Sequence, residues 1–350
     1  MPLFFSLILF KQLLQVSMDE IMSDIGYSDM RSMLKDCLCE IQAMAAIPGV
    51  TGISSGFWRL DLLTDGFENG KVYVIGARPC MGKVSLMLSM IESIVLESKQ
   101  AVLLFSTNHM KSDYVSRLLS IHCDIPTSKL QKGRLDMYEW ERVDKRVAAL
   151  IEAPLFIHDS LDLPINELVE TSRNCVRESG IKIIFVDCLQ MINFAKEGET
   201  PSDRIAKVMI LLKQLAYQLS LPIVVGSMMN RGVDYREGLM GKEPQLKDLA
   251  FSSYIEGLAD IVMMVHRPEY YQIYQDEDGR DLHGVMQILV KKNGLRPQGC
   301  VYLSYQQDTG IVSLTEDTKS KPVSLEEFGA DNETVKSLIK TFDLEEELPF

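Results

Sequence analysis

The sequence lacks the cysteine pattern of a module that is held together by metal or disulfides. Its seven cysteines include no CxxC pair, so neither a zinc site nor a disulfide framework is indicated. The cysteines are Cys37, Cys39, Cys80, Cys123, Cys175, Cys188 and Cys300. We therefore expect reduced thiols and a cytoplasmic location.

Long apolar runs are also missing. The run from Leu3 to Phe10 is far shorter than the roughly 20 residues that span a bilayer, and no basic segment precedes it as in a signal peptide. We interpret this run as a buried helix or, alternatively, as part of a misassigned start before Met18. A membrane is therefore not an expected partner.

Basic residues are fewer than acidic residues in this sequence. The chain has 36 Lys plus Arg against 49 Asp plus Glu, a net charge of −13, which argues against a surface that coats nucleic acid indiscriminately. A local basic channel stays compatible with this balance. The 46% hydrophobic and 24% charged residues are ordinary globular values, and 350 residues can bury a sizeable core in one large or two modest domains.

Short apolar runs alternate with helical patterns from Lys71 onwards. Strands are expected over 72–75, 102–106, 155–158, 181–187 and 223–227, and helices over 84–96, 113–123, 137–150, 165–177 and 203–219. This order predicts an α/β domain with a mostly parallel sheet and helices on both faces. Three later strands, over 261–265, 285–290 and 300–303, are expected to extend the sheet in antiparallel fashion.

The chain is expected to have three parts: an N-terminal helical arm or linker over 1–50, the α/β domain over 51–315, and an acidic tail over 316–350. The tail holds ten acidic residues and four lysines, and such a composition predicts weak order.

A glycine-containing loop between the first strand and the next helix has the pattern of a phosphate-binding loop. Its candidate nucleotide-binding residues are Arg78, Pro79, Cys80, Met81, Gly82, Lys83, Val84 and Ser85. Backbone N–H groups can wrap phosphates here while the lysine reaches the β and γ oxygens. The alternative is an incidental Gly-Lys at a strand–helix turn. We predict ATP or ADP as the ligand.

The metal site of this loop is expected to be weak. A P-loop ordinarily has Ser or Thr after its lysine to ligate Mg²⁺, but Val84 stands there. Ser85 follows, and about 100° of helical rotation directs it elsewhere. Asp187 ends an apolar strand, where P-loop proteins place an acid near the metal and its water.

Several segments together resemble the motor domain of the DnaB-type replicative DNA helicases, over about residues 51–314. They are Ala-Arg-Pro-Cys-Met-Gly-Lys (77–83), Val-Asp-Cys-Leu-Gln-Met (186–191), Ser227 with Asn-Arg (230–231), Asp-Leu (248–249) followed by Ile-Glu (255–256), and His-Arg-Pro-Glu-Tyr-Tyr (266–271). The resemblance implies a RecA-like ATPase in a hexameric ring, with single-stranded DNA in its centre and nucleotide between subunits. The sequence does not contain that family's globular N-terminal domain.

The departures from the family pattern fall on residues with implied catalytic roles. Asn108 replaces the glutamate that polarises the attacking water, and an amide cannot accept a proton. Met228 replaces a glutamine that resembles a γ-phosphate sensor. The family's arginine finger is missing, so Lys292 or Arg296 would substitute imperfectly. The Asp-Leu-Ala-Phe-Ser run (248–252) lacks two charges of the family pattern.

These departures predict a degenerate paralogue that binds nucleotide but hydrolyses it slowly or not at all, in a homo-oligomer or beside a true replicative helicase. The alternative is an active, divergent 5′–3′ helicase in which Asp187, Ser85 and Arg296 take over the missing roles. A third hypothesis is a recombinase-like or mobile-element partner protein.

Two partner predictions remain open. The loop 193–199 has one lysine against two acids, a poor footprint for a DNA backbone, while a second basic stretch (Arg231, Arg236, Lys242) is as compatible with solvent as with DNA. The tail ends in Pro-Phe350 and resembles the tip by which single-stranded-DNA-binding proteins recruit replication proteins. The alternative is a tail without a partner.

The aromatic cluster at 270, 271 and 274 is expected either to stack on a nucleotide base or to pack between a strand and a loop.

Overall fold

The computed structural model describes residues 29–30, 33–35, 37–38, 50–194 and 200–315. The chain divides into two units, Met1–Gly49 with Pro322–Phe350, and Val50–Lys321. In the first unit, residues 30, 33–35, 37 and 38 are helical. The rest of the predicted helical arm, most of the predicted DNA loop at 193–199 and the acidic tail with Phe350 lie outside the described residues.

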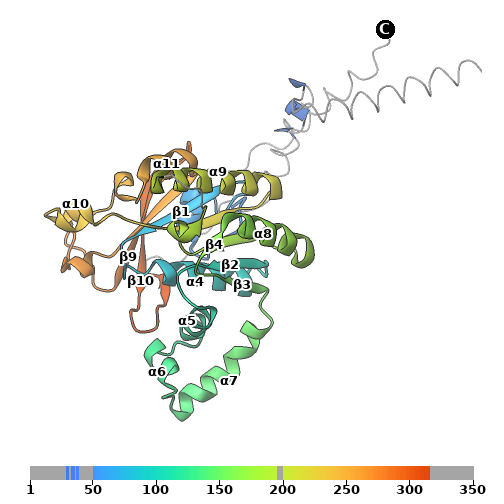
Figure 1. Ribbon diagram of the computed structural model, residues 1–350. Coiled ribbons are helices and arrows are strands. Elements are labelled where there is room, and N and C mark those ends of the chain that lie inside the picture. The colour runs from blue at the N-terminus through green and yellow to red at the C-terminus, as the bar shows by residue number, and fades with distance from the viewer. Residues whose placement is uncertain (1–28, 31–32, 36, 39–49, 195–199, 316–350) are drawn as a thin grey trace, which may run out of the picture. The chain divides into compact units, whose positions relative to one another are not determined.

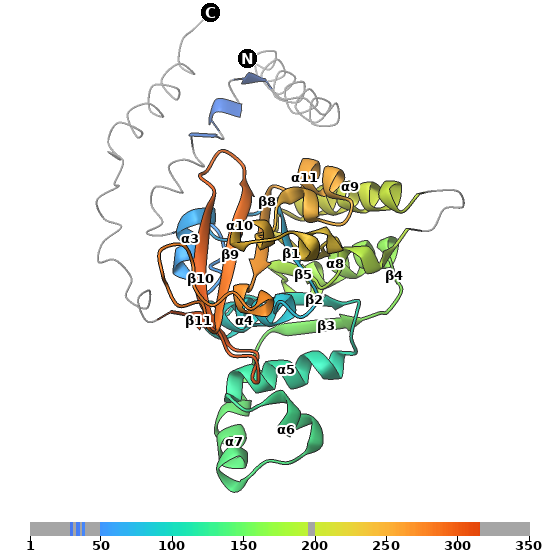
Figure 2. The same ribbon diagram turned by 90° about the vertical axis from the view of Figure 1, so that its left-hand side faces the viewer.

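The second unit is built on a nine-stranded sheet in the order β11-β10-β9-β8-β1-β7-β5-β2-β3 (Figures 1 and 2). Its strands are β1 (Val72–Ala77), β2 (Val102–Ser106), β3 (Leu155–Asp159), β5 (Ile183–Val186), β7 (Ile223–Met228), β8 (Ile261–His266), β9 (Val285–Asn293), β10 (Gly299–Tyr305) and β11 (Val312–Leu314). A small second sheet pairs β4 (Leu163–Pro164) with β6 (Ile192–Asn193). The predicted α/β class with antiparallel C-terminal strands is confirmed.

One predicted strand direction is wrong. The strand at 261–265 was expected to be antiparallel, but β8 pairs in parallel with β1, with Tyr73 opposite Ile261. The chain between β7 and β8 runs back along the sheet through α11 (Ser252–Leu258), so β8 starts at the same end as β1. Antiparallel pairing begins only with β9.

Helices cover both faces of the sheet (Figure 2). They are α3 (Trp58–Thr64), α4 (Lys83–Leu96), α5 (Lys111–Cys123), α6 (Thr127–Lys132), α7 (Met137–Ile151), α8 (Ile165–Ser179), α9 (Pro201–Leu219) and α10 (Leu239–Lys242), with α11. Short 3₁₀ turns complete the fold: η1 (Leu189–Met191), η2 (Arg231–Tyr235), η3 (Leu246–Asp248) and η4 (Pro268–Tyr271).

The alternation of side chains along β1 explains the two cores. Tyr73 and Ile75 belong to the cluster that contains α4, while Val72 and Val74 belong to the cluster that contains α8 and α9. All six residues of β1 are buried, as expected for a central strand with helices on both sides. Because β1 pairs in parallel with β7 and β8, the carboxyl ends of these strands lie at one edge of the sheet, where the candidate site is found.

Candidate nucleotide-binding site

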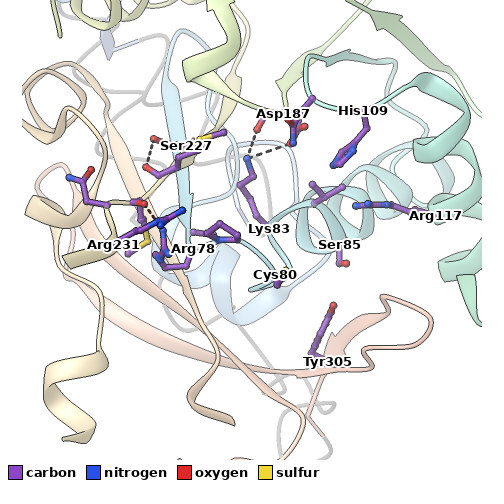
Figure 3. Close-up of a pocket in the computed structure, with 18 residues that line it drawn as sticks. Arg78, Cys80, Lys83, Ser85, His109, Arg117, Asp187, Ser227, Arg231 and Tyr305 are labelled. Carbon is purple, nitrogen blue, oxygen red and sulfur yellow. Dashed lines mark hydrogen bonds and ion pairs between the residues drawn. The ribbon is translucent and has the colours of Figure 1, made fainter. Parts of the chain in front are cut away.

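A cavity of about 670 Å³ lies where several parallel strands end (Figure 3). It is lined by Ala77, Arg78, Pro79, Cys80, Gly82, Lys83, Val84, Ser85, Asn108, His109, Arg117, Asp187, Ser227, Met228, Met229, Asn230, Arg231 and Tyr305. The carboxyl ends of strands in an open α/β sheet are where ligands bind, and the volume suits a nucleotide. The structure thus brings together the loop at 78–85 with Asn108, Asp187 and Met228. Met81, also a residue of this loop, is buried and does not line the cavity.

The loop from β1 to α4 needs an unusual backbone. Gly82 caps α4 with φ of 91° and Cys80 has φ of 65°, a region that L side chains rarely adopt. A Cβ on Gly82 would also lie 2.5 Å from the Cε of Met286. Glycine is therefore required where the loop turns into the helix.

Lys83 and Asp187 meet across the floor of the cavity. The ammonium of Lys83 donates to the backbone carbonyl of Asp187 at 2.6 Å and lies 3.4 Å from its Oδ1. Gly226 of β7 permits this approach, because a Cβ there would lie 1.9 Å from the Asp187 carbonyl oxygen and 2.8 Å from the Lys83 Nζ. The lysine of a P-loop can exchange such a carboxylate for a phosphate group.

Asp187 can serve a hard cation. Its side chain is 1% exposed, and neither carboxylate oxygen has a hydrogen-bond partner among the described residues. Unpaired buried oxygens of this kind are the ligands that Mg²⁺ or its bound water prefers. Val84 adds no hydroxyl, and Ser85 points toward the Tyr305 side of the cavity, away from Asp187 (Figure 3). The part of the chain that the structure describes therefore supplies the acid of a P-loop metal site but not the hydroxyl.

Four cationic side chains of the described chain line the cavity against one carboxylate, Asp187. Arg78 is held by Asp234 through two bonds of 2.7 and 3.3 Å and donates to the Met229 carbonyl. Burial alone would raise the pKa of Asp234, but the bonds from Arg78 and from the Tyr271 hydroxyl hold it below its ordinary value. On a chain with a net charge of −13, this concentration of positive charge indicates an anionic ligand.

Arg117 and Arg231 are the cations of the cavity that make no ion pair or side-chain hydrogen bond with the described residues. Arg117 extends from α5 beside His109, whereas Arg231 comes from η2 on the side of Arg78 (Figure 3). Guanidinium groups without partners at the rim of a P-loop are suited to phosphate oxygens.

The substituted positions converge on the same cavity. Asn108 is exposed just after β2, and Met228 ends β7 with 39% exposure. The Gln190 amide braces this end of β7, because it donates to the Ser227 hydroxyl at 2.9 Å and accepts from the Met228 N–H at 3.0 Å. Within residues 50–194 and 200–315, Asp187 is the one acidic residue that lines the cavity.

The two finger candidates lie elsewhere in the same subunit. Lys292 donates to the carbonyls of Glu256 and Gly257, at 2.5 and 3.4 Å. Arg296 binds Glu68 at 2.5 Å and Asp65 at 3.2 Å. A finger acts on a neighbouring subunit, so that role stays a prediction, but in this chain both side chains already have partners.

Sequence reasoning missed the contribution of the C-terminal strands. Arg267 is 6% exposed, donates to the Cys80 carbonyl at 3.3 Å, and lies over the Tyr305 ring at 4.3 Å from its centroid. It thereby ties the phosphate loop to β10. No local motif marks this contact, because it joins residues far apart in the chain. Two members of the aromatic cluster make packing contacts: the Tyr271 hydroxyl donates to Asp234, and Tyr274 stacks on His283 at 4.5 Å between ring centroids.

Comparison with known proteins shows which family this chain resembles. Residues 52–312 match the DnaB-like helicase C-terminal domain. The chain is 30% identical over 298 residues to the replicative DNA helicase DnaB of Buchnera aphidicola subsp. Baizongia pistaciae, covering 84% of this chain and 63% of that protein. It is 28% identical to DnaB of Geobacillus stearothermophilus, covering 73% and 55%. The chain thus spans less than two thirds of the length of these relatives.

Solved structures agree with this assignment. An isolated ATPase domain of known structure aligns with a TM-score of 0.75 and 25% identity, covering 83% of this chain and all of that domain. A DnaB-like replicative helicase, solved in a study of its interactions with primase, aligns at 0.73 and 25%, covering 87% and 71%. No helix among the described residues is long and apolar enough to cross a membrane. The RecA-like fold is confirmed, and the chain belongs to the family of DnaB-like helicase C-terminal domains.

Proposed function

We propose that the chain is a nucleotide-binding DnaB-type motor subunit that acts in DNA replication with impaired ATP hydrolysis, as a regulatory or structural paralogue. One observation carries this proposal: Asp187 is the one carboxylate that lines the cavity in the described chain. Asn108 occupies the position where the general base for the attacking water is expected. Phosphate-binding groups are kept, whereas the described residues of the cavity include no second carboxylate that would accept the proton of the attacking water, as the family's glutamate does.

The residues of the cavity bind and orient a nucleotide. Backbone N–H groups of the loop at 80–83 face the phosphates, and Lys83 turns from Asp187 to the β and γ oxygens. Arg117 and Arg231 supply further donors to the phosphate chain. Mg²⁺, when bound, neutralises phosphate charge, and Asp187 would hold it through water without help from Val84. Its binding is accordingly weak.

Assembly is part of the proposal. We expect a homo-oligomeric ring or association with a true replicative helicase, because the own-chain cavity receives neither Lys292 nor Arg296. Single-stranded DNA is an expected ligand of such a ring, and the acidic tail ending in Phe350 is an expected docking segment for replication proteins. Co-purification of those proteins that is unchanged by deletion of 343–350 would contradict the tail assignment.

Restoring the missing groups tests the catalytic claim. The double variant V84T/N108E returns a metal-binding hydroxyl and a general base, so ATP turnover should rise about 100-fold or more, the ordinary contribution of a base. The control V84T/N108Q keeps the size of the new side chain without a carboxylate and should show no such rise. If both variants turn over ATP at the wild-type rate, these two positions do not limit hydrolysis.

A further inference from the structure

Three buried oxygens without hydrogen-bond partners in the described chain lie beside the floor of the nucleotide cavity. They are the two carboxylate oxygens of Asp187 and the phenolic oxygen of Tyr114. The two side chains are 1% and 2% exposed. Folded proteins leave few buried polar atoms unpaired, so this group needs an explanation from the function of the site.

Tyr114 is directed toward the site from α5. Its ring contacts that of His109, which lines the cavity, at 5.9 Å between centroids. A phenol carries its proton at neutral pH, and Asp187 lies close enough to Tyr114 for its charge to raise the pKa of the phenol, after the larger effect of burial. The nearby Ser106 hydroxyl is occupied as a donor to the His109 carbonyl. The Tyr114 phenol thus lies beside the buried Asp187 carboxylate, and no hydrogen bond of ordinary geometry joins the two side chains.

Nucleotide binding changes the surroundings of Asp187. Its one ion pair with the described residues is that with Lys83, at 3.4 Å. When Lys83 moves to the phosphates, the buried carboxylate loses that cation, and an uncompensated buried charge is strongly unfavourable. A metal held by a hydroxyl at the start of the helix would ordinarily lie near this acid, but position 84 is valine.

We propose that Tyr114 is a positioning residue that donates a hydrogen bond from its phenol to Asp187 when Lys83 turns to a bound nucleotide. The phenol then compensates the carboxylate as a metal-bound water does in an ordinary P-loop site. This inference rests on nucleotide binding in the cavity and deepens it: binding should need little or no Mg²⁺.

Calorimetric titration of ATP into the full chain tests the inference, in EDTA and in Mg²⁺. The wild type should bind with dissociation constants that agree within about threefold in the two media, since the charge on Asp187 is compensated in both. Y114F removes the donor and should weaken binding in EDTA about 10- to 100-fold, the effect of losing a hydrogen bond to a charged group. Added Mg²⁺ should recover part of this loss. The control Y217F, at a tyrosine that is 79% exposed on α9, should bind as the wild type does.

Thermal unfolding of the nucleotide-free protein separates positioning from simple structural support. Because the Tyr114 hydroxyl has no hydrogen-bond partner among the described residues of the free protein, its removal by phenylalanine should leave the melting temperature unchanged or raise it. A hydroxyl that merely supports the fold would lower the melting temperature and leave the ratio of the affinities in EDTA and Mg²⁺ unaltered.

The outcomes distinguish this inference from the proposed function. If the wild type binds no ATP in either medium, nucleotide binding fails and the inference falls with it. If the wild type binds ATP and Y114F binds equally well in EDTA, nucleotide binding stands and the role of Tyr114 is wrong. Weakened binding by Y114F with an undiminished melting temperature supports the inference.

Discussion

At the scale of single residues, charge compensation decides which side chains are free to meet a ligand. Arg78 is committed to Asp234, and Lys83 to Asp187. Arg117 and Arg231 have no such commitment within the described residues, although both line the cavity. Their burial beside a ligand would therefore disrupt none of the described interactions.

We predict that R117A and R231A each weaken ATP binding about tenfold or more, because each removes charge-assisted hydrogen bonds to phosphate. Fluorescence or calorimetric titration measures the effect. Neither variant should change the free energy of unfolding, since no described partner is left unpaired. R177A is the matched control, because Arg177 is 73% exposed on α8. Affinities within twofold of the wild type for both pocket variants would contradict the assignment.

A buried histidine gives the protein a predictable sensitivity to acid. His266 is 3% exposed, and burial lowers its pKa from 6.5 to about 4. Two smaller effects oppose each other, because the charge of Glu243 raises this pKa and that of Lys291 lowers it. Between these two values the unfolded chain binds a proton that the folded chain does not. Stability is therefore unaffected by this group above pH 6.5 and falls as the pH drops from 6.5 toward 4.

Replacement of His266 should remove this dependence. Between about pH 6.5 and 4.5, the free energy of unfolding of H266F should fall less steeply than that of the wild type. The difference between the two decreases should be on the order of 2 kcal/mol over this range. Urea unfolding at several pH values measures it. H283Q, at a histidine that is exposed, should behave like the wild type, and equal slopes for H266F and the wild type would contradict the account.

At the scale of elements, the turn between β9 and β10 is fastened to the segment after α3. The Arg296 guanidinium donates to Glu68, Asp65 and the Thr64 carbonyl, and Asn293 donates to the Leu63 carbonyl. These contacts link residues about 230 positions apart and hold the antiparallel edge of the sheet against α3.

Loss of this fastening should be measurable. R296A removes bonds to two carboxylates on a partly exposed surface, so we predict a loss of roughly 1–2 kcal/mol in the free energy of unfolding. K292A, which removes only donations to backbone carbonyls, should cost less. A variant R296A with unaltered stability would indicate that the arginine is available for another role.

The elements themselves were largely predictable because their patterns are local. Apolar runs marked every described strand from β1 to β10 apart from the two-residue β4 and β6, and helical spacing marked α4, α5, α7, α8 and α9. The six-residue α6 and the three-residue β11 are too short to carry a periodic signal. The direction of β8 depends on the path of the connection before it, which no local pattern encodes.

The site was predictable only where a motif defined it. Lys83 and Asp187 belong to recognisable strand-end patterns, and the structure joins them although 104 residues separate them. Tyr114 and Arg117 lie in the amphipathic helix α5, and Tyr305 ends β10, the second strand of the sheet. In these places the side chains look like ordinary packing or surface residues. Only the tertiary fold shows that they surround the phosphate loop.

At the scale of the whole molecule, the described cavity of one subunit receives neither of the finger candidates, Lys292 and Arg296. We therefore predict that the protein self-associates, and more strongly with ATP than without it, because bound phosphate charge would attract a cation from a neighbouring subunit. Sedimentation velocity with and without ATP measures this. K83A should bind no ATP and show no ATP-dependent shift, and a wild type that stays monomeric in both conditions would contradict a homo-oligomer.

The central claim is that nucleotide is bound but not efficiently hydrolysed. ATP turnover with Mg²⁺ and single-stranded DNA, measured beside equilibrium ATP binding on the same preparation, tests it most directly. The account predicts saturable binding with turnover below about 0.1 s⁻¹, roughly 100-fold or more under the typical enzyme rate of about 10 s⁻¹. DNA-stimulated turnover at about 1 s⁻¹ or more would contradict it and identify the chain as an active, divergent helicase motor.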